Sequence, residues 1–451
     1  MDTVNTNIFS YLASFEDFIW SYFCLPAILL VGLYFTLKSR AVQLRRLPTV
    51  VKTFFGFLLN KSEEGCSRTG VHPIKTFFAC IGGCVGIGNI VGITTAVQIG
   101  GPGAIFWMWI AAIIGSLVKY SEVFLGVNNR VKVGDGYRGG PMYVLRKAFG
   151  KKWIGALFCL LMCVYGVEVF QFSVVTSSVS ANFGIAKPLV VIAFLGLIVF
   201  AEWGGVNRVG SICATIIPFF ITCYIGMGLW IVFANITLLP HVFADIFHYA
   251  FTAHAATGAF CGSALILTMT QGIRRACYCC DIGVGYASIM HSESRVQSPS
   301  KQASLVIFDV FLDTFVICTM SSVIVLVTGT WTQDIDALFL VQNALAAYFP
   351  YMNIFIPLLL TLIGYSVIIA YFCAGMKAAL FLSERHGRKL YYLYSGLILV
   401  LVSFVDTSVA YSVMSCVLAL LLTLNLSGLF RLRREVDFGF GEREALPAFA
   451  E

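Results

Sequence analysis

Polar and apolar positions divide the chain into long apolar runs, separated by short segments that hold most of the charge. Runs such as 189–201 and 212–233 do not alternate polar and apolar residues, so they are not strands of an outer-membrane barrel. Runs of about 20 residues are typical of helices that cross a bilayer. The pattern predicts eleven such spans, at 18–37, 73–99, 102–127, 152–181, 188–203, 209–236, 256–276, 303–328, 350–374, 391–406 and 409–429.

Composition agrees with an all-α polytopic membrane protein. Hydrophobic residues make up 59% of the chain and charged residues 12%, against roughly 25% charged residues in soluble domains. Of the 30 Lys and Arg residues, 28 fall in alternate segments between the predicted spans or within the last few residues of the adjoining span ends, with Lys187 on the opposite side and Lys119 inside a span. Cations accumulate in cytoplasmic loops. The count predicts a plasma-membrane protein of the bacterial inner-membrane type, with its N-terminus outside and its C-terminus in the cytoplasm.

The cations are spread over six loops, whereas a nucleic-acid-binding protein gathers them on one folded face. The lipid bilayer is therefore the expected partner, and nucleic acid is not.

The glycine-rich segment 82–92 carries the most information about mechanism, because five of its eleven residues are glycine. One interpretation is close helix packing through Gly-x-x-x-Gly pairs. The other is an interrupted helix, whose freed N–H groups bind a carboxylate and whose freed carbonyls bind a cation. Asn89, in the middle of the span, favours the second interpretation because a buried amide needs partners. A similar segment, 258–263, lies five spans later.

This spacing predicts an inverted five-plus-five repeat preceded by one extra helix. The expected units are 1–72 (an N-terminal helix and a cytoplasmic interfacial segment), 73–236 (first repeat), 237–430 (second repeat) and 431–451 (cytoplasmic tail).

Several motifs then point to one family. They are 86–92 (GIGNIVG), 100–109 (GGPGAIFWMW), 119–122 (KYSE), 139–143 (GGPMY) and 311–314 (FLDT). Together they resemble the alanine or glycine:cation symporter family. The resemblance implies a fold like that of the neurotransmitter:sodium symporters. It also implies uptake of a small neutral amino acid by alternating access, with Na+ as the coupling ion and no cofactor.

The resemblance also implies roles for particular residues. The N–H groups of Ile87 and Gly88 would hold the substrate carboxylate, and Asn89 would bridge substrate and cation. The carbonyls of Gly82 and Val85 would bind sodium with the retained hydroxyl of Thr361. The side-chain pocket would be lined by Tyr165, Phe170, Phe260 and Tyr365.

The chain departs from the family pattern at several of these places. Ile87 replaces Thr, Glu168 replaces Asn, Leu360 replaces Ser and Tyr365 replaces Trp, and 280–285 reads CDIGVG for NEAGLG. Lost hydroxyls weaken a sodium site, since hard cations take about six oxygen ligands. Two alternatives therefore stay open: proton coupling through Glu168, or a passive facilitator with an altered substrate.

Charged residues inside spans are functional candidates. Lys119 and Glu122 share a helix face, either as a pair at the cytoplasmic mouth or as a gate. Glu168 has a role in transport or in a structural hydrogen bond. Asp309 and Asp313 are four residues apart and repel each other, and only Asp313, with Thr314, is kept as a structural or gating candidate.

An enzyme and a metal site are not expected. The cysteines at 277, 279 and 280 lack paired C-x₂-C spacing, and no nucleophile–base or metal-protease motif stands out.

Overall fold

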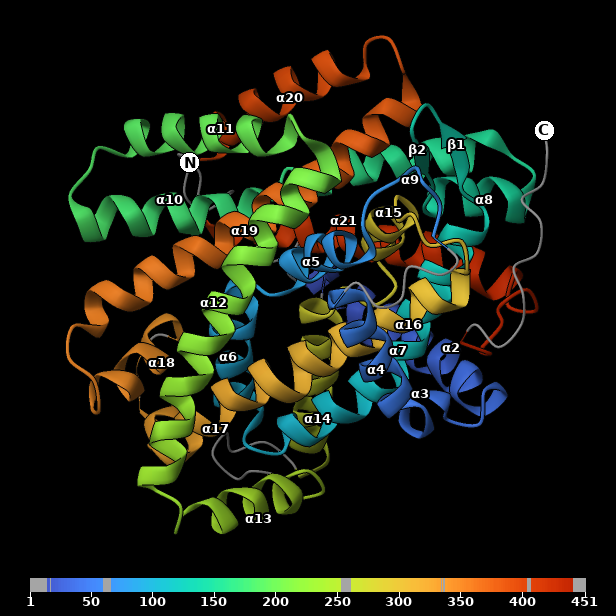
Figure 1. The fold of residues 1–451 in the computed structure, drawn as a ribbon. Helices are drawn as coiled ribbons and strands as arrows, with labels where there is room; N and C mark the ends of the chain where they lie inside the picture. The colour runs from blue at the N-terminus through green and yellow to red at the C-terminus, as the bar shows by residue number, and fades with distance from the viewer. Residues whose placement is uncertain are drawn as a thin grey trace.

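The computed structural model describes residues 14–16, 18–59, 66–252, 261–333, 335, 337–403 and 407–440. These residues are mostly helical, as the apolar runs predict, and Figure 1 shows the helices as one bundle. A short antiparallel hairpin joins β1 (Val131–Val133) to β2 (Gly136–Arg138), with Val131 opposite Arg138.

Every predicted span coincides with a helix or with two consecutive helices. In chain order these are α2 (Leu25–Lys38), α5 with α6 (Pro73–Cys84, Val91–Gly100), α7 (Ala104–Asn128), α9 with α10 (Lys152–Tyr165, Val169–Phe183), α11 (Lys187–Glu202), α12 (Gly205–Ala234), α14 (Cys261–Cys279), α16 with α17 (Pro299–Val310, Thr319–Val327), α19 (Met352–Leu382), α20 (Gly387–Val402) and α21 (Thr407–Arg431). Within the described residues, seven helices are long and apolar enough to cross a membrane, or eight with the bent pair α5–α6.

Shorter helices fill the connections. They are α3 (Val42–Arg45), α4 (Leu47–Leu58), α8 (Pro141–Phe149), α13 (Leu239–Tyr249), α15 (Tyr286–Ser292) and α18 (Ala337–Ala346). In Figure 1 the β-hairpin and α8 lie at the opposite end of the molecule from α13. Since the charge pattern predicts these connections on opposite sides of the membrane, the fold agrees with it.

Helix α7 forms the centre of the bundle. Of its most apolar 18 residues, 83% are buried inside the protein, which is more than for any other candidate span. It packs against α14, α15 and α16. Its polar side chains therefore face other helices rather than lipid.

Candidate functional site

The first interruption separates α5 from α6. In an α-helix each N–H bonds to the carbonyl four residues earlier. Here the N–H of Gly86 donates to Asn89 Oδ1 at 2.9 Å, and the N–H of Asn89 donates to the carbonyl of Gly86 at 3.2 Å. The carbonyls of Gly82 and Val85 thus lose their helical donors, and the axis bends by 62°. This is an interrupted helix, so packing alone does not explain the glycines.

Two further interruptions lie close by in space. Helices α9 and α10 are separated at 166–168, where Glu168 has a left-handed backbone with φ of 51°. Helices α14 and α15 are separated at 280–285, where Gly283 and Gly285 have φ of 80° and 97°. Asp281, just after the end of α14, is also left-handed with φ of 49°, and the two glycines adopt such angles without steric cost.

Half of the predicted break at 258–263 is not described by the structure. Residues 253–260 lie outside the described part of the chain, and α14 begins at Cys261 and continues to Cys279.

The three interruptions meet at a cavity of about 100 Å³. One water-sized sphere needs about 10–15 Å³ on this measure, so the cavity holds several waters or one small molecule. Its walls come from α5, α9, α10, α14, α19, α21 and the three interruptions. The lining residues are Gly83, Cys84, Gly86, Gly88, Asn89, Tyr165, Glu168, Phe170, Gln171, Arg275, Tyr278, Cys279, Asp281, Val367, Tyr371, Met414 and Ser415.

Three charged side chains face this cavity. Glu168 is 5% exposed, yet its carboxylate accepts no hydrogen bond from any residue that the structure describes. Arg275 Nε likewise has no acceptor within the described chain. Asp281 differs, because its Oδ2 atom accepts from Cys84 Sγ at 3.3 Å. Buried charges without partners are costly. Of the three, Glu168 is the buried acid without a hydrogen-bond donor in the described chain, and Arg275 is half-buried.

A buried ion pair lies behind the cavity wall. Lys119 Nζ is 2.6 Å from Asp309 Oδ2, and both residues are fully buried. This corrects the predicted pairing of Lys119 with Glu122. The Glu122 carboxylate instead accepts from the N–H of Ser288 at 3.2 Å and from Asn425 Nδ2 at 3.1 Å. Asp309, which the sequence left without a role, is the counter-ion of Lys119.

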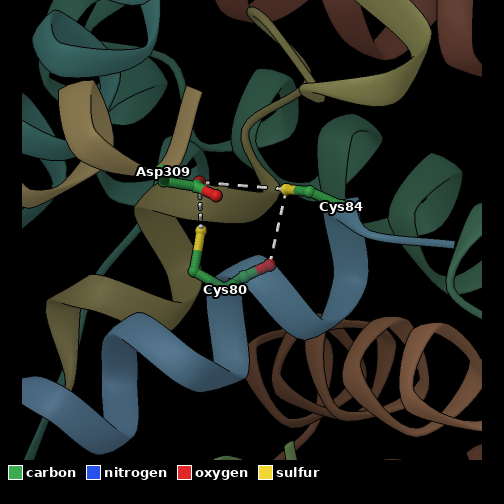
Figure 2. A group of neighbouring side chains, drawn as sticks. All are labelled: Cys80, Cys84 and Asp309. Atoms are coloured by element: carbon green, nitrogen blue, oxygen red, sulfur yellow. Dashed lines mark hydrogen bonds between the residues drawn. The ribbon is translucent and has the colours of Figure 1, made fainter. Parts of the chain in front are cut away.

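Two thiols of α5 surround the same carboxylate. Figure 2 shows Cys80 and Cys84 directed at Asp309, with Cys80 Sγ 3.6 Å from Asp309 Oδ2. One ligand atom from each residue lies within 4.8 Å of the others, which is close enough to hold a metal ion. However, Lys119 Nζ lies 2.6 Å from Asp309 Oδ2 and 3.2 Å from Cys84 Sγ. A cation therefore already occupies this cluster, and we assign no metal to it.

Asn89 connects the first interruption to the one between α14 and α15. Its amide donates to the Asp313 carboxylate and to Cys318 Sγ at 3.4 Å. Cys280 Sγ in turn lies 2.9 Å from both Asp313 Oδ2 and Thr314 Oγ1. Asp313 and Thr314 belong to a π-helical turn, Phe311–Cys318, a geometry common at functional sites. The contacts of these residues are structural: they hold the two interruptions together.

The other predicted site residues divide into three groups. Gly88, Asn89, Tyr165 and Phe170 line the cavity, whereas Phe260 lies outside the described residues. The side chain of Ile87 points instead toward Gly364, although its backbone belongs to the interruption. Thr361 donates to the carbonyl of Pro357 in its own helix at 2.7 Å.

Tyr365 is a further correction. Its hydroxyl donates to the carbonyl of Leu197 in α11 at 2.9 Å, and it does not line the cavity. Tyr371 lines the cavity in its place. The two tyrosines are six residues apart on a continuous helix and so lie on different faces.

The sequence also placed Arg274 and Arg275 in a cytoplasmic loop, but both lie within α14. Arg274 pairs with Glu16, and Arg275 lines the cavity. Arg275 and Asp281 are the cavity residues that the sequence did not identify. The available signal was an arginine pair, and an aspartate two residues before the first of two glycines, in one apolar stretch.

A helical bundle with interrupted helices around a charged internal cavity is typical of secondary transporters. The solved structure of MhsT in complex with L-phenylalanine has the same fold. It superposes with a TM-score of 0.58 at 13% identity, covering 81% of this chain and 90% of that one. The chain belongs to the sodium:alanine symporter family, whose sequence model matches residues 5–438.

Two relatives illustrate the family. The probable sodium/glutamine symporter GlnT of Bacillus subtilis is 32% identical, with 93% of this chain and 87% of GlnT covered. The sodium/alanine symporter AgcS of Methanococcus maripaludis is 28% identical, with 83% and 84% covered. The chain is thus a multi-pass membrane transporter of the amino acid:cation symporter class, and not an enzyme.

Proposed function

We propose that the protein imports a small neutral amino acid, such as alanine or glycine, together with sodium by alternating access. The substrate binds in the cavity between the three helix interruptions. The observation that carries this proposal is the convergence of freed backbone groups and unpaired charges on one buried cavity. In the plasma membrane the N-terminus lies outside and the C-terminus in the cytoplasm, as the cation distribution predicts.

The backbone of the first interruption supports recognition of the substrate carboxylate. Gly88 lines the cavity, and in the described chain nothing accepts a hydrogen bond from the N–H of Ile87 or Gly88. A carboxylate is the natural partner for such N–H groups.

The carbonyl side of the same interruption supports a sodium site. Gly82 and Val85 have lost their helical donors and are free to coordinate a cation. Thr361 is the hydroxyl that the family resemblance supplies. Ser366 is a second candidate, because a methyl group at Gly82 would lie 4.0 Å from Ser366 Cβ.

Proton coupling is the alternative with a specific observation in its favour. Glu168 presents a buried carboxylate without a hydrogen-bond donor to the cavity, and a proton would neutralise it as well as a cation would.

Uptake into proteoliposomes tests both candidates. Labelled alanine and glycine are supplied with an inward sodium gradient, an inward proton gradient or neither. Accumulation that requires sodium supports the proposal, and accumulation that requires the proton gradient supports the alternative. Equilibration without accumulation under any gradient would contradict both and indicate a facilitator.

A further inference from the structure

The cavity is lined by an acidic side chain, Glu168, and a basic side chain, Arg275, that do not form an ion pair with each other. Glu168 and Arg275 both line a space of about 100 Å³. No ion pair within 4.0 Å joins them, and in the described residues neither the Glu168 carboxylate nor Arg275 Nε has a hydrogen-bond partner. Opposite charges in a buried space attract strongly. The lack of an ion pair between them therefore requires an explanation.

The positive group lies beside the first interruption. A methyl group at Gly92 would be 2.2 Å from Arg275 Nη1, so the guanidinium packs against the first turn of α6. The unbonded N–H of Gly88 faces the same cavity. A guanidinium next to free backbone donors is suited to a carboxylate.

The negative group lies at the interruption between α9 and α10. The left-handed backbone at Glu168 starts α10, and the carboxylate is buried near Tyr165, Tyr371 and Asp281. Asp281 already accepts from Cys84, which also contacts Lys119. Glu168 is thus the acid that remains available to a ligand. The other titratable groups that face the cavity are Arg275, the phenol of Tyr278, and the thiols of Cys84 and Cys279.

We infer that Glu168 and Arg275 are the two poles of a zwitterion site. Glu168 binds the substrate's ammonium group, and Arg275 binds its carboxylate. This inference rests on the proposed function and adds the residues that select an α-amino acid. A ligand that lacks either charge leaves the buried Glu168 carboxylate or the half-buried Arg275 guanidinium without a partner, so it binds weakly.

Binding to purified protein in detergent tests the two poles separately. The probes are L-alanine, L-lactate (without the ammonium group) and L-alaninamide (without the carboxylate), with glycine as a second amino acid. Wild type should prefer alanine to both analogues. Removing one partner of a buried charge pair costs about 2–5 kcal/mol, which is a loss of about 30-fold or more. We expect Glu168→Gln to lower the affinity for alanine by that factor and to leave the affinity for lactate unchanged. Arg275→Gln should lower the affinity for alanine by a similar factor and leave the affinity for alaninamide unchanged.

Two further variants serve as controls. Arg274→Gln alters the neighbouring arginine, which pairs with Glu16 outside the cavity, and should retain the wild-type preferences. Glu168→Asp keeps the charge and should recover part of the lost affinity. All variants are first checked for a monodisperse elution profile.

The outcomes separate the inference from the proposed function. The zwitterion site is refuted if Glu168→Gln still prefers alanine to lactate as strongly as the wild type does, or if Arg275→Gln still prefers alanine to alaninamide. It is also refuted if either variant loses affinity for alanine, lactate and alaninamide equally. In these cases amino-acid binding stands. If the wild type binds neither alanine nor glycine, both the proposed function and the inference are refuted.

Discussion

Substitution of Asp309 should change the free energy of unfolding by an amount that can be worked out from the structure. Its carboxylate lies 2.6 Å from Lys119 Nζ, and neither residue is exposed. Asp309→Asn keeps the shape of the side chain and removes its charge, so the ammonium stays buried without its counter-ion. Breaking a buried ion pair in this way costs about 3–5 kcal/mol. We expect the free energy of unfolding to fall by that amount.

Unfolding by a denaturing detergent, followed through tryptophan fluorescence, measures this loss. The double variant Lys119→Met/Asp309→Leu replaces the pair with apolar residues of similar volume and should recover most of the stability. Arg138 and Glu384 provide the matched control, because they form a 3.0 Å ion pair whose side chains are 31% and 79% exposed. Glu384→Gln should cost at most about 1 kcal/mol.

Two results would refute this reasoning. An Asp309→Asn variant as stable as Glu384→Gln would show that the buried pair contributes no more than a surface pair. A double variant as unstable as the single variant would show that packing, and not the unpaired ammonium, causes the loss.

Two other predictions concern the first interruption. If Ser366, whose Cβ would lie 4.0 Å from a methyl group at Gly82, belongs to the sodium site, Ser366→Ala should raise the sodium concentration for half-maximal uptake more than Thr361→Ala does. The reverse order would favour Thr361 as the ligand. Gly83→Ala should lower uptake at least about fivefold, because its methyl group would lie 2.4 Å from Tyr286 Oη and overpacking there costs about 1–3 kcal/mol. Gly196→Ala places its methyl group in open space and should leave uptake unchanged. Equal uptake by both variants would contradict this prediction.

The sequence determined the architecture to a large extent. Apolar runs report which segments avoid water, and each predicted span coincides with a helix. The glycines of 82–92 and the central Asn89 also predicted an interrupted helix, because backbone that cannot continue a helix must find other partners. Glu168 stood out as a charge deep in an apolar run, and the structure places it at the cavity.

The tertiary structure alone decided which charges and faces meet. The pairing of Lys119 with Asp309 joins α7 to α16, residues 190 positions apart in the chain. Tyr371 rather than Tyr365 lines the cavity because the orientation of α19 depends on its neighbours. Arg275 joins the cavity because α14 continues to Cys279, beyond the end of the predicted span. Periodicity fixes which residues share a helix face, but the partner of that face depends on how the helices pack, and contacts between distant segments leave no local pattern in the sequence.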